Sequence, residues 1–278
     1  MSIRINVDPT NPGQFFACCG LLELADRLWL GAEGWFEGQE FKIAFSKEQG
    51  TLQTLLTKLS LATLESSLTD AGVKRLGTLL SKAKSKLTKQ DQEDKARLQE
   101  MWQRERLHLS APFDLLLYWW WDKTLKTWAA KQFVIEISRP MLAAIATMTW
   151  TDQTRTHCLN QTAKLRAPPF YFDAANNTQN TPRDNGFAPD EVKRAAIDRP
   201  LLEVLAFIGL ERCRPRRVEN SELLQYTTWA TPLPLAVVAA ATLGELQLVG
   251  DRTYEFRMLF RTEYMKAILP SQLVRENS

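Results

Sequence analysis

The sequence predicts an α+β fold: a body of mixed helices and strands that carries a mainly helical insertion. Short segments alternate apolar and polar residues, which is the period of a half-buried strand. Longer segments repeat apolar residues every three or four positions, which is the period of a helix packed on one face. Residues 47–109 show the helical period alone and include a run of basic residues. We therefore expect residues 1–46 and 110–278 to form the body and residues 47–109 to form a basic helical insertion.

The first elements of the body follow directly from their patterns. Ile3, Ile5 and Val7 alternate with polar residues and predict a strand, which the Pro12–Gly13 turn ends. Apolar residues then recur at helical spacing from about residue 14 to residue 30, on a stripe wide enough to predict a deeply packed helix. Residues 41–45 alternate again and predict a second strand.

The predicted insertion carries the first candidate nucleic-acid surface. Between Lys74 and Lys89 there are six basic residues and no acidic one. Four leucine and alanine positions at helical spacing predict one helix through this run, with a basic flank beside its apolar face. Basic side chains aligned in this way contact phosphates without reading sequence. The alternative is a solvated helix face. The candidate residues are Arg75, Lys82, Lys86 and Lys89.

The second half of the body alternates strands and helices. Residues 113–122 are apolar on both faces and predict a covered strand. Proline is tolerated in the first turn of a helix, so helices are expected to begin at Ser138–Pro140 and Asp198–Pro200. A further helix is predicted over 234–243. Strands at 246–249 and 254–260 are expected to pair as a hairpin around Gly250 and Asp251, and residues 176–185 are expected to form a polar loop.

Bulk composition limits the class of protein. No run of about 18 apolar residues exists, and the first residues lack the layout of a signal peptide, so we expect no membrane association. The four cysteines have no disulfide-framework spacing, which favours a cytoplasmic protein. The net charge of +3 is too small to indicate nucleic-acid binding by itself, so the distribution of charge matters more.

The chain lacks the common catalytic motifs. It has no phosphate-binding loop, dinucleotide fingerprint, paired C-x-x-C, H-E-x-x-H or G-x-S-x-G string, and it has two histidines in all. We therefore expect no enzymatic activity, no metal and no cofactor. Cys18 and Cys19 are interpreted as core residues, and a His157–Cys158 dyad is disfavoured because adjacent side chains rarely meet. A cryptic nuclease remains an alternative, with its carboxylates at Asp173, Asp184, Asp190 and Glu191.

Three further features offer nucleic-acid contacts. Four arginines follow the apolar helix at 201–210, which is more than the one or two that a helix dipole explains. The polar loop carries Asn180 and Arg183, whose side chains suit adenine and guanine edges. Trp128 and the run Trp119–Trp121 either stack on bases or lie in the core. The arginines are Arg212, Arg214, Arg216 and Arg217, of which the last three join the candidate binding residues.

Several separated strings together resemble one family, and they span nearly the whole chain in the family's order. The resemblance is to the small Cas-eight-type large subunit (Csb family) of the type I-G, formerly I-U, CRISPR Cascade effector complex. The strings are NPGQFFACCGLL (11–22), LKTWAAKQ (125–132), PFYFD (169–173), NGFAP (185–189), EVLAFIGL (203–210) followed by Arg214 and Pro215, YTTWATPLP (226–234) and FRTEY (260–264).

This resemblance implies a non-catalytic role in antiviral defence. Its partners would be the CRISPR guide RNA, target double-stranded DNA, Cas-seven-type backbone subunits, a fused Cas-five/Cas-six-type subunit and a helicase-nuclease. Large subunits of this kind help recognise the protospacer-adjacent motif, open the duplex and recruit the nuclease, while guide pairing supplies most of the sequence information. The resemblance thus implies DNA- and RNA-binding within a ribonucleoprotein complex. A purely architectural subunit of the same complex is the alternative.

Overall fold

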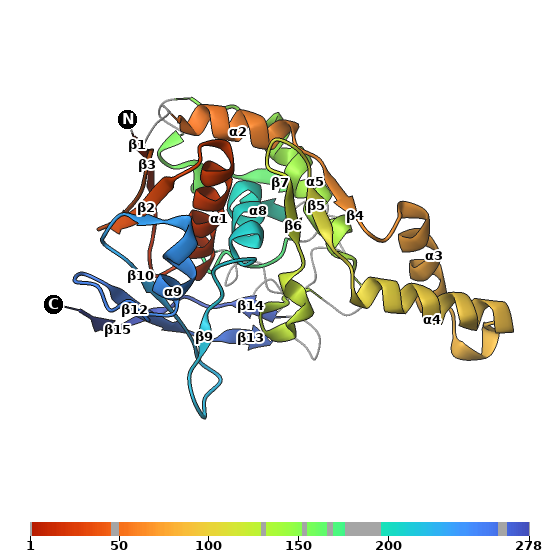
Figure 1. The fold of residues 1–278 in the computed structure, drawn as a ribbon. Coiled ribbons are helices and arrows are strands. Elements are labelled where there is room, and N and C mark those ends of the chain that lie inside the picture. The colour runs from red at the N-terminus through yellow and green to blue at the C-terminus, as the bar shows by residue number, and fades with distance from the viewer. Residues whose placement is uncertain are drawn as a thin grey trace.

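A computed structural model describes most of the chain and confirms the predicted α+β class. Helices and small antiparallel sheets surround one continuous hydrophobic core (Figure 1). The described residues are 2–45, 50–128, 132–151, 155–165, 169–175, 196–260 and 266–277.

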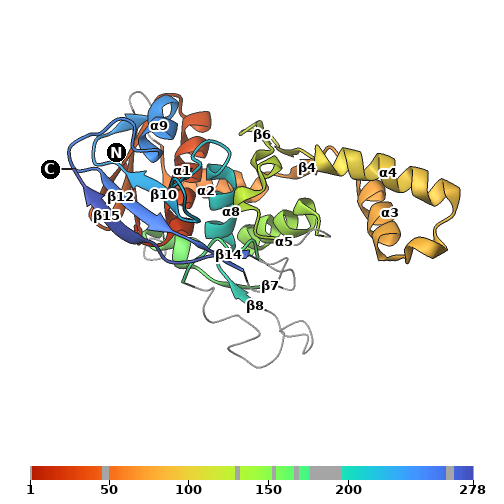
Figure 2. The ribbon, with the colours of Figure 1, turned by 90° about the horizontal axis from the view of Figure 1, so that it is seen from below.

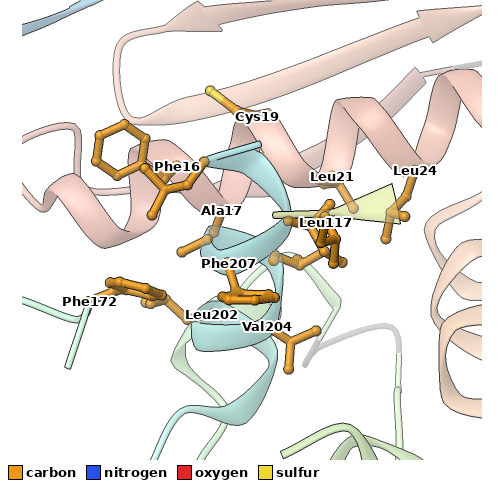
Figure 3. Packing of buried hydrophobic residues seen from close by; sticks show 14 of the residues in the cluster. Phe16, Ala17, Cys19, Leu21, Leu24, Leu117, Phe172, Leu202, Val204 and Phe207 are labelled. Carbon is orange, nitrogen blue, oxygen red and sulfur yellow. The ribbon is translucent and has the colours of Figure 1, made fainter. Parts of the chain in front are cut away.

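Two helices cross at the centre of the body. α1 (Pro12–Leu28) begins where the side chain of Asn11 accepts a hydrogen bond from the Gly13 amide, and every residue from Pro12 to Ala25 is buried. A helix that is apolar on all sides must be covered on all sides. α8 (Pro200–Gly209) is buried over its whole length and begins at the predicted proline. Phe16 and Ala17 of α1 and Phe207 of α8 lie in the packing between them (Figure 3).

The two central helices approach so closely that only glycine fits at their contact. A Cβ atom on Gly20 would lie 2.0 Å from the carbonyl oxygen of Leu205, and one on Gly209 would lie 2.0 Å from that of Phe16. Both neighbours are backbone atoms, so no side-chain rotation relieves the clash. Backbone contact at this crossing therefore sets the distance between α1 and α8.

Two four-stranded antiparallel sheets cover α1. The first has the order β1 (Ser2–Asn6), β3 (Glu40–Phe45), β2 (Ala32–Glu37) and β11 (Leu233–Pro234). The second has the order β15 (Gln272–Glu276), β12 (Arg252–Phe256), β10 (Leu224–Thr228) and β9 (Arg216–Arg217). Aromatic rings join the second sheet to α1, since Tyr226 stacks on Phe15 with ring centroids 4.3 Å apart. The strands predicted at 3–7 and 41–45 are confirmed.

The hairpin predicted around Gly250 is wrong. Residues 246–249 form no strand, because the Asp251 carboxylate accepts from the Leu248 amide and closes a turn there. The Gly250 amide instead donates to the carbonyl of Asn277, near the end of the described chain. β12 pairs with β10 and β15, while β13 (Met258–Phe260) pairs with β14 (Lys266–Ile268).

The segment expected to be an insertion contains parts that differ in their surroundings. α2 (Leu52–Leu61) packs on α5 (Val134–Thr147), and four of its leucines, Leu52, Leu55, Leu56 and Leu59, belong to the main core. β4 (Leu64–Ser66) pairs with β5 (Leu107–Leu109), which pairs with β6 (Leu115–Leu117). The expected absence of strands is therefore wrong, because three-residue strands are too short to show alternation. α3 (Asp70–Ser81), η1 (Lys84–Lys86) and α4 (Lys89–Gln103) project from the body (Figures 1 and 2), and we call residues 70–103 the projecting hairpin.

Two other boundaries differ from the sequence prediction. The strand expected over 113–122 ends at Leu117, because the Glu211 carboxylate accepts from the amides of Tyr118 and Trp119 and turns the chain into η2 (Trp119–Trp121). α5 begins before Ser138–Pro140 and contains Pro140 internally. The remaining short elements are η3 (Lys123–Leu125), η4 (Cys158–Asn160), β7 (Ala163–Leu165), β8 (Ala196–Asp198), η5 (Leu235–Val237) and α9 (Val238–Thr242), the last two in place of the single helix predicted over 234–243.

We expect Gly209→Ala to destabilise the protein, because the new methyl group collides with backbone that cannot move aside. Overpacking of this kind costs about 1–3 kcal/mol and exceeds the gain in helix propensity of about 1 kcal/mol. Gly77→Ala is the matched control, since its Cβ would meet nothing nearer than a Phe133 ring carbon at 3.7 Å. Urea unfolding of both variants measures the difference. A Gly209→Ala protein as stable as the wild type would contradict the close crossing.

Candidate nucleic-acid interface

Five basic residues of the projecting hairpin form two groups. Residues 74–89 do not form the single predicted helix, since α3 ends at Ser81 and α4 begins only at Lys89. The Thr88 side chain caps α4 in a capping box with Asp91, and this turns the chain back along α3. Ala83 and Leu87 therefore do not continue the apolar face of Leu76, and acidic residues of α4 come to lie beside α3.

Arg75 and Lys82 hold the two helices of the hairpin together. Arg75 Nη2 lies 2.8 Å from Asp91 Oδ1 and 2.9 Å from Asp94 Oδ2, and Lys82 Nζ lies 3.5 Å from Asp91 Oδ2. The hydrogen bond from the Thr88 amide, with help from Arg75, lowers the pKa of Asp91. The hydrogen bond from Arg75 likewise lowers the pKa of Asp94. These two candidate cations are thus already matched by acids that follow them in the chain.

The other group, Lys84, Lys86 and Lys89, stands exposed at the tip of the hairpin. Across the described part of the chain, no acidic side chain pairs with any of the three. We call them the tip lysines. They place three unmatched positive charges at the end of an element that extends away from the body (Figure 2).

The four arginines after α8 also have different surroundings. Arg212 Nε lies 2.7 Å from the buried Glu23 carboxylate, so this side chain ties α8 to α1. Arg214 Nη2 lies 3.9 Å from Glu211. Arg216 donates to the Gln225 side chain at 2.8 Å, and both Arg216 and Arg217 are exposed on the edge strand β9. The sequence cluster is therefore partly structural and partly free at the surface.

Most of the candidate stacking tryptophans lie in the core. Alternation predicts Trp119 and Trp121 on one face and Trp120 on the other, but the 3₁₀ turn buries Trp119 and Trp120 together. Trp119 Nε1 donates to the carbonyl of Phe207 at 2.9 Å, and Trp128 is also buried. Trp121 remains partly exposed beside Tyr118 and Arg106. No sequence spacing indicated Tyr118 or Arg106, because the pairing of β5 with β6 brings them together.

Asp173, one of the four carboxylates proposed for a cryptic nuclease, is part of a buried polar network. Asp173 accepts from Asn11 Nδ2 at 2.7 Å and pairs with Arg199 Nη1 at 3.0 Å. Glu203 accepts from the amides of Phe172 and Asp173, both at 3.1 Å. No group of three metal-ligating side chains is found among the described residues. Asp184, Asp190 and Glu191 lie outside the described residues, as do Asn180 and Arg183 of the predicted polar loop.

Cys18 and Cys19 are buried, as predicted, and so are Cys158 and Cys213. All four are free thiols, and burial raises the pKa of Cys18 and Cys19. Burial also raises the pKa of Cys158 to about 12, which keeps it protonated at neutral pH. The neighbouring His157 ring lies at the surface, where it contacts the Asn6 side chain at 3.1 Å. The two side chains therefore do not form a dyad.

Comparisons with known proteins provide no further assignment. No family model, curated protein or solved structure matches the chain. In the part of the chain that is described, none of the helices has both the length and the apolar character needed to cross a membrane.

The buried carboxyl of Glu203 predicts that stability falls as pH rises. Burial raises its pKa to about 8, so the folded state holds a proton that the unfolded state loses above a pKa of about 4.3. The stabilisation is complete below the pKa that Glu203 has in the unfolded state. It is lost as pH rises through the pKa that Glu203 has in the folded state, at up to about 1.4 kcal/mol per pH unit. Burial likewise raises the pKa of Asp198 and of Glu105 to about 7. Between pH 7 and 8, Glu203 therefore makes the largest contribution to the pH dependence of the unfolding free energy.

We expect Glu203→Gln to flatten the pH dependence of the unfolding free energy between pH 7 and 8. The amide oxygen can still accept from the Phe172 and Asp173 amides. Urea unfolding across pH 5.5 to 8.5 provides the measurement. Glu105→Gln is the control, because its effect should be confined to lower pH. An unchanged slope above pH 7 in Glu203→Gln would rule out a protonated Glu203 in the folded protein.

Proposed function

We propose that this chain is a non-catalytic nucleic-acid-binding subunit of a type I-G CRISPR effector complex. In that role it contacts target DNA, helps recognise the protospacer-adjacent motif and open the duplex, and helps recruit the helicase-nuclease. The observation that carries the proposal is the set of unmatched tip lysines on the projecting hairpin. The family-like strings, spread over nearly the whole chain, supply the identity of the complex.

The form of the hairpin suits contact with a nucleic-acid backbone. Arg75 links α3 to two acids of α4, and Leu76, Leu79 and Leu98 are buried. The tip lysines are thereby held away from the body, where each can approach a phosphate without desolvating the core. Neutralising a phosphate releases condensed counterions and adds affinity that does not depend on sequence. A subunit of a guided complex needs this kind of contact, because base pairing reads the target.

An architectural role in the same complex is the second candidate. The edge strand β15 exposes Leu273 and Val274, and each residue is nearly half exposed. An open strand edge with apolar side chains is a common docking surface for another protein. If this surface is the main functional one, the subunit bridges its neighbours and the tip lysines merely keep the hairpin solvated.

The two candidates differ in how target binding responds to salt. We expect Lys86→Ala with Lys89→Ala to weaken binding of the guide-loaded complex to target duplex, by a similar factor for every target sequence. The logarithmic salt slope should fall by about 0.9 for each phosphate that the variant no longer neutralises. Mobility-shift titrations at several salt concentrations measure the slope.

The matched control is Lys58→Ala with Lys164→Ala, which removes the same charge from exposed sites on the body. It should leave the slope close to that of the wild-type complex. An unchanged slope in the hairpin variant would favour the architectural role. Failure of the wild-type chain to co-purify with the backbone subunits and guide RNA would reject membership of the complex.

A further inference from the structure

One surface cluster outside the projecting hairpin combines exposed aromatic rings with an arginine. The Arg106 Cζ atom lies 5.1 Å from the centroid of the Trp121 ring and 5.7 Å from that of Tyr118. The two rings are 5.1 Å apart, and they are 37% and 38% exposed. Among the described residues, no carboxylate pairs with Arg106. We call Arg106, Tyr118 and Trp121 the arginine–aromatic cluster.

The fold builds this cluster from residues distant in the sequence. β5 and β6 pair with Leu107 opposite Leu117, so Arg106 and Tyr118 are the next residues beyond the same end of the pair. The η2 turn then returns Trp121 to the side of Tyr118, and Trp121 Nε1 donates to the carbonyl of Glu105 at 2.8 Å. The Glu211 carboxylate fixes the start of the turn. The rings are therefore held in place before any ligand arrives.

Arg214, which follows α8, is linked to the cluster through Glu211. Glu211 accepts from the Tyr118 amide at 2.7 Å and pairs with Arg214, so one carboxylate lies between the two residues. Arg214 and Arg217 also contribute to lowering the pKa of Asp122, after the larger effect of its hydrogen bond from the Thr124 side chain. Both arginines therefore act electrostatically on the carboxylate that follows the η2 turn. In Figure 1 the chain after β6 runs between β9 and the base of α4.

The chemistry of the cluster selects an unpaired nucleic acid. Aromatic rings and arginine planes stack on base faces, and each stacked base contributes about 1–3 kcal/mol. In a duplex the neighbouring base pairs already cover those faces, so exposed aromatic rings gain most from an unpaired base. The adjacent guanidinium groups match the charge of a phosphate backbone. A purely apolar protein partner would leave Arg106 without a compensating charge.

We propose that the arginine–aromatic cluster, with Arg214 and Arg217, binds an unpaired stretch of DNA or RNA. A base stacks on Trp121 or Tyr118, and the backbone runs along the arginines. This site deepens the proposed function and rests on it for its biological ligand, because opening a target duplex produces an unpaired strand. Its binding chemistry can be tested on the purified chain alone.

The experiment measures fluorescence anisotropy of labelled oligothymidine, oligouridine and a blunt duplex of about a dozen residues with the full-length chain. We expect Trp121→Ala to weaken single-strand binding by about 5- to 150-fold, which is the equivalent of losing one stacked base. Duplex binding should change much less.

Trp121→Phe retains a ring and should recover most of the lost affinity. Arg106→Ala should weaken the same single strands, and Lys58→Ala, which also removes one exposed positive charge, should not. If oligothymidine binds more tightly than oligouridine, the preferred ligand is DNA, and the opposite order indicates RNA.

Several outcomes would overturn the site. The proposed site is rejected if the Trp121→Ala and Arg106→Ala variants both bind the two single strands with wild-type affinity. Equal loss of single-strand and duplex binding would show charge or folding effects instead of stacking, and thermal unfolding of each variant separates these two causes. If the Trp121→Ala and Arg106→Ala variants bind oligonucleotides normally but no longer co-purify with the complex, the surface contacts a protein partner instead. Single-strand binding through Trp121 by a chain that joins no complex would preserve the site while rejecting the proposed function.

Discussion

The backbone contact between α1 and α8 is the constraint on which the rest of the structure depends. Gly20 and Gly209 let the two helices cross at a distance that no side chain permits. Because both helices are apolar on every side, each must be enclosed, and the two larger sheets, α2 and α5 supply the cover. The crossing also fixes the C-terminal end of α8. From that end, Glu211 reaches the Tyr118 amide and Arg212 reaches Glu23.

The same end of α8 shows how one short basic run can serve different purposes. Arg212 is matched by a buried glutamate of α1 and belongs to the framework. Glu23 is buried and also pairs with Arg27 at 2.9 Å, so Arg212 shares in compensating a buried carboxylate. Arg216 and Arg217 lie beyond the framework on an edge strand and face solvent. The projecting hairpin repeats this division, since Arg75 links its helices while the tip lysines stay unmatched.

Sequence patterns predicted the features that are local and failed where partners are distant. The strand at 3–7, the start of α8 at Pro200 and the burial of Cys18 follow from period, proline geometry and composition. β4, β5 and β6 have three residues each, which is too few for alternation to register. Asp91 lies after the basic run that it neutralises, so a count within that run missed it. Arg106 meets Tyr118 only through the β5–β6 register.

The two candidate binding surfaces differ in how firmly the fold holds them. The projecting hairpin has few buried residues, and its cross-links are partly exposed ion pairs, which contribute little individually. Segments of this kind open locally at lower free-energy cost than the core. The arginine–aromatic cluster instead adjoins Trp119, which is buried against α8. In the functions proposed here, lysine-to-phosphate contact, which tolerates movement, is assigned to the weakly held element, and base stacking, which needs fixed ring planes, is assigned to the element packed on the core.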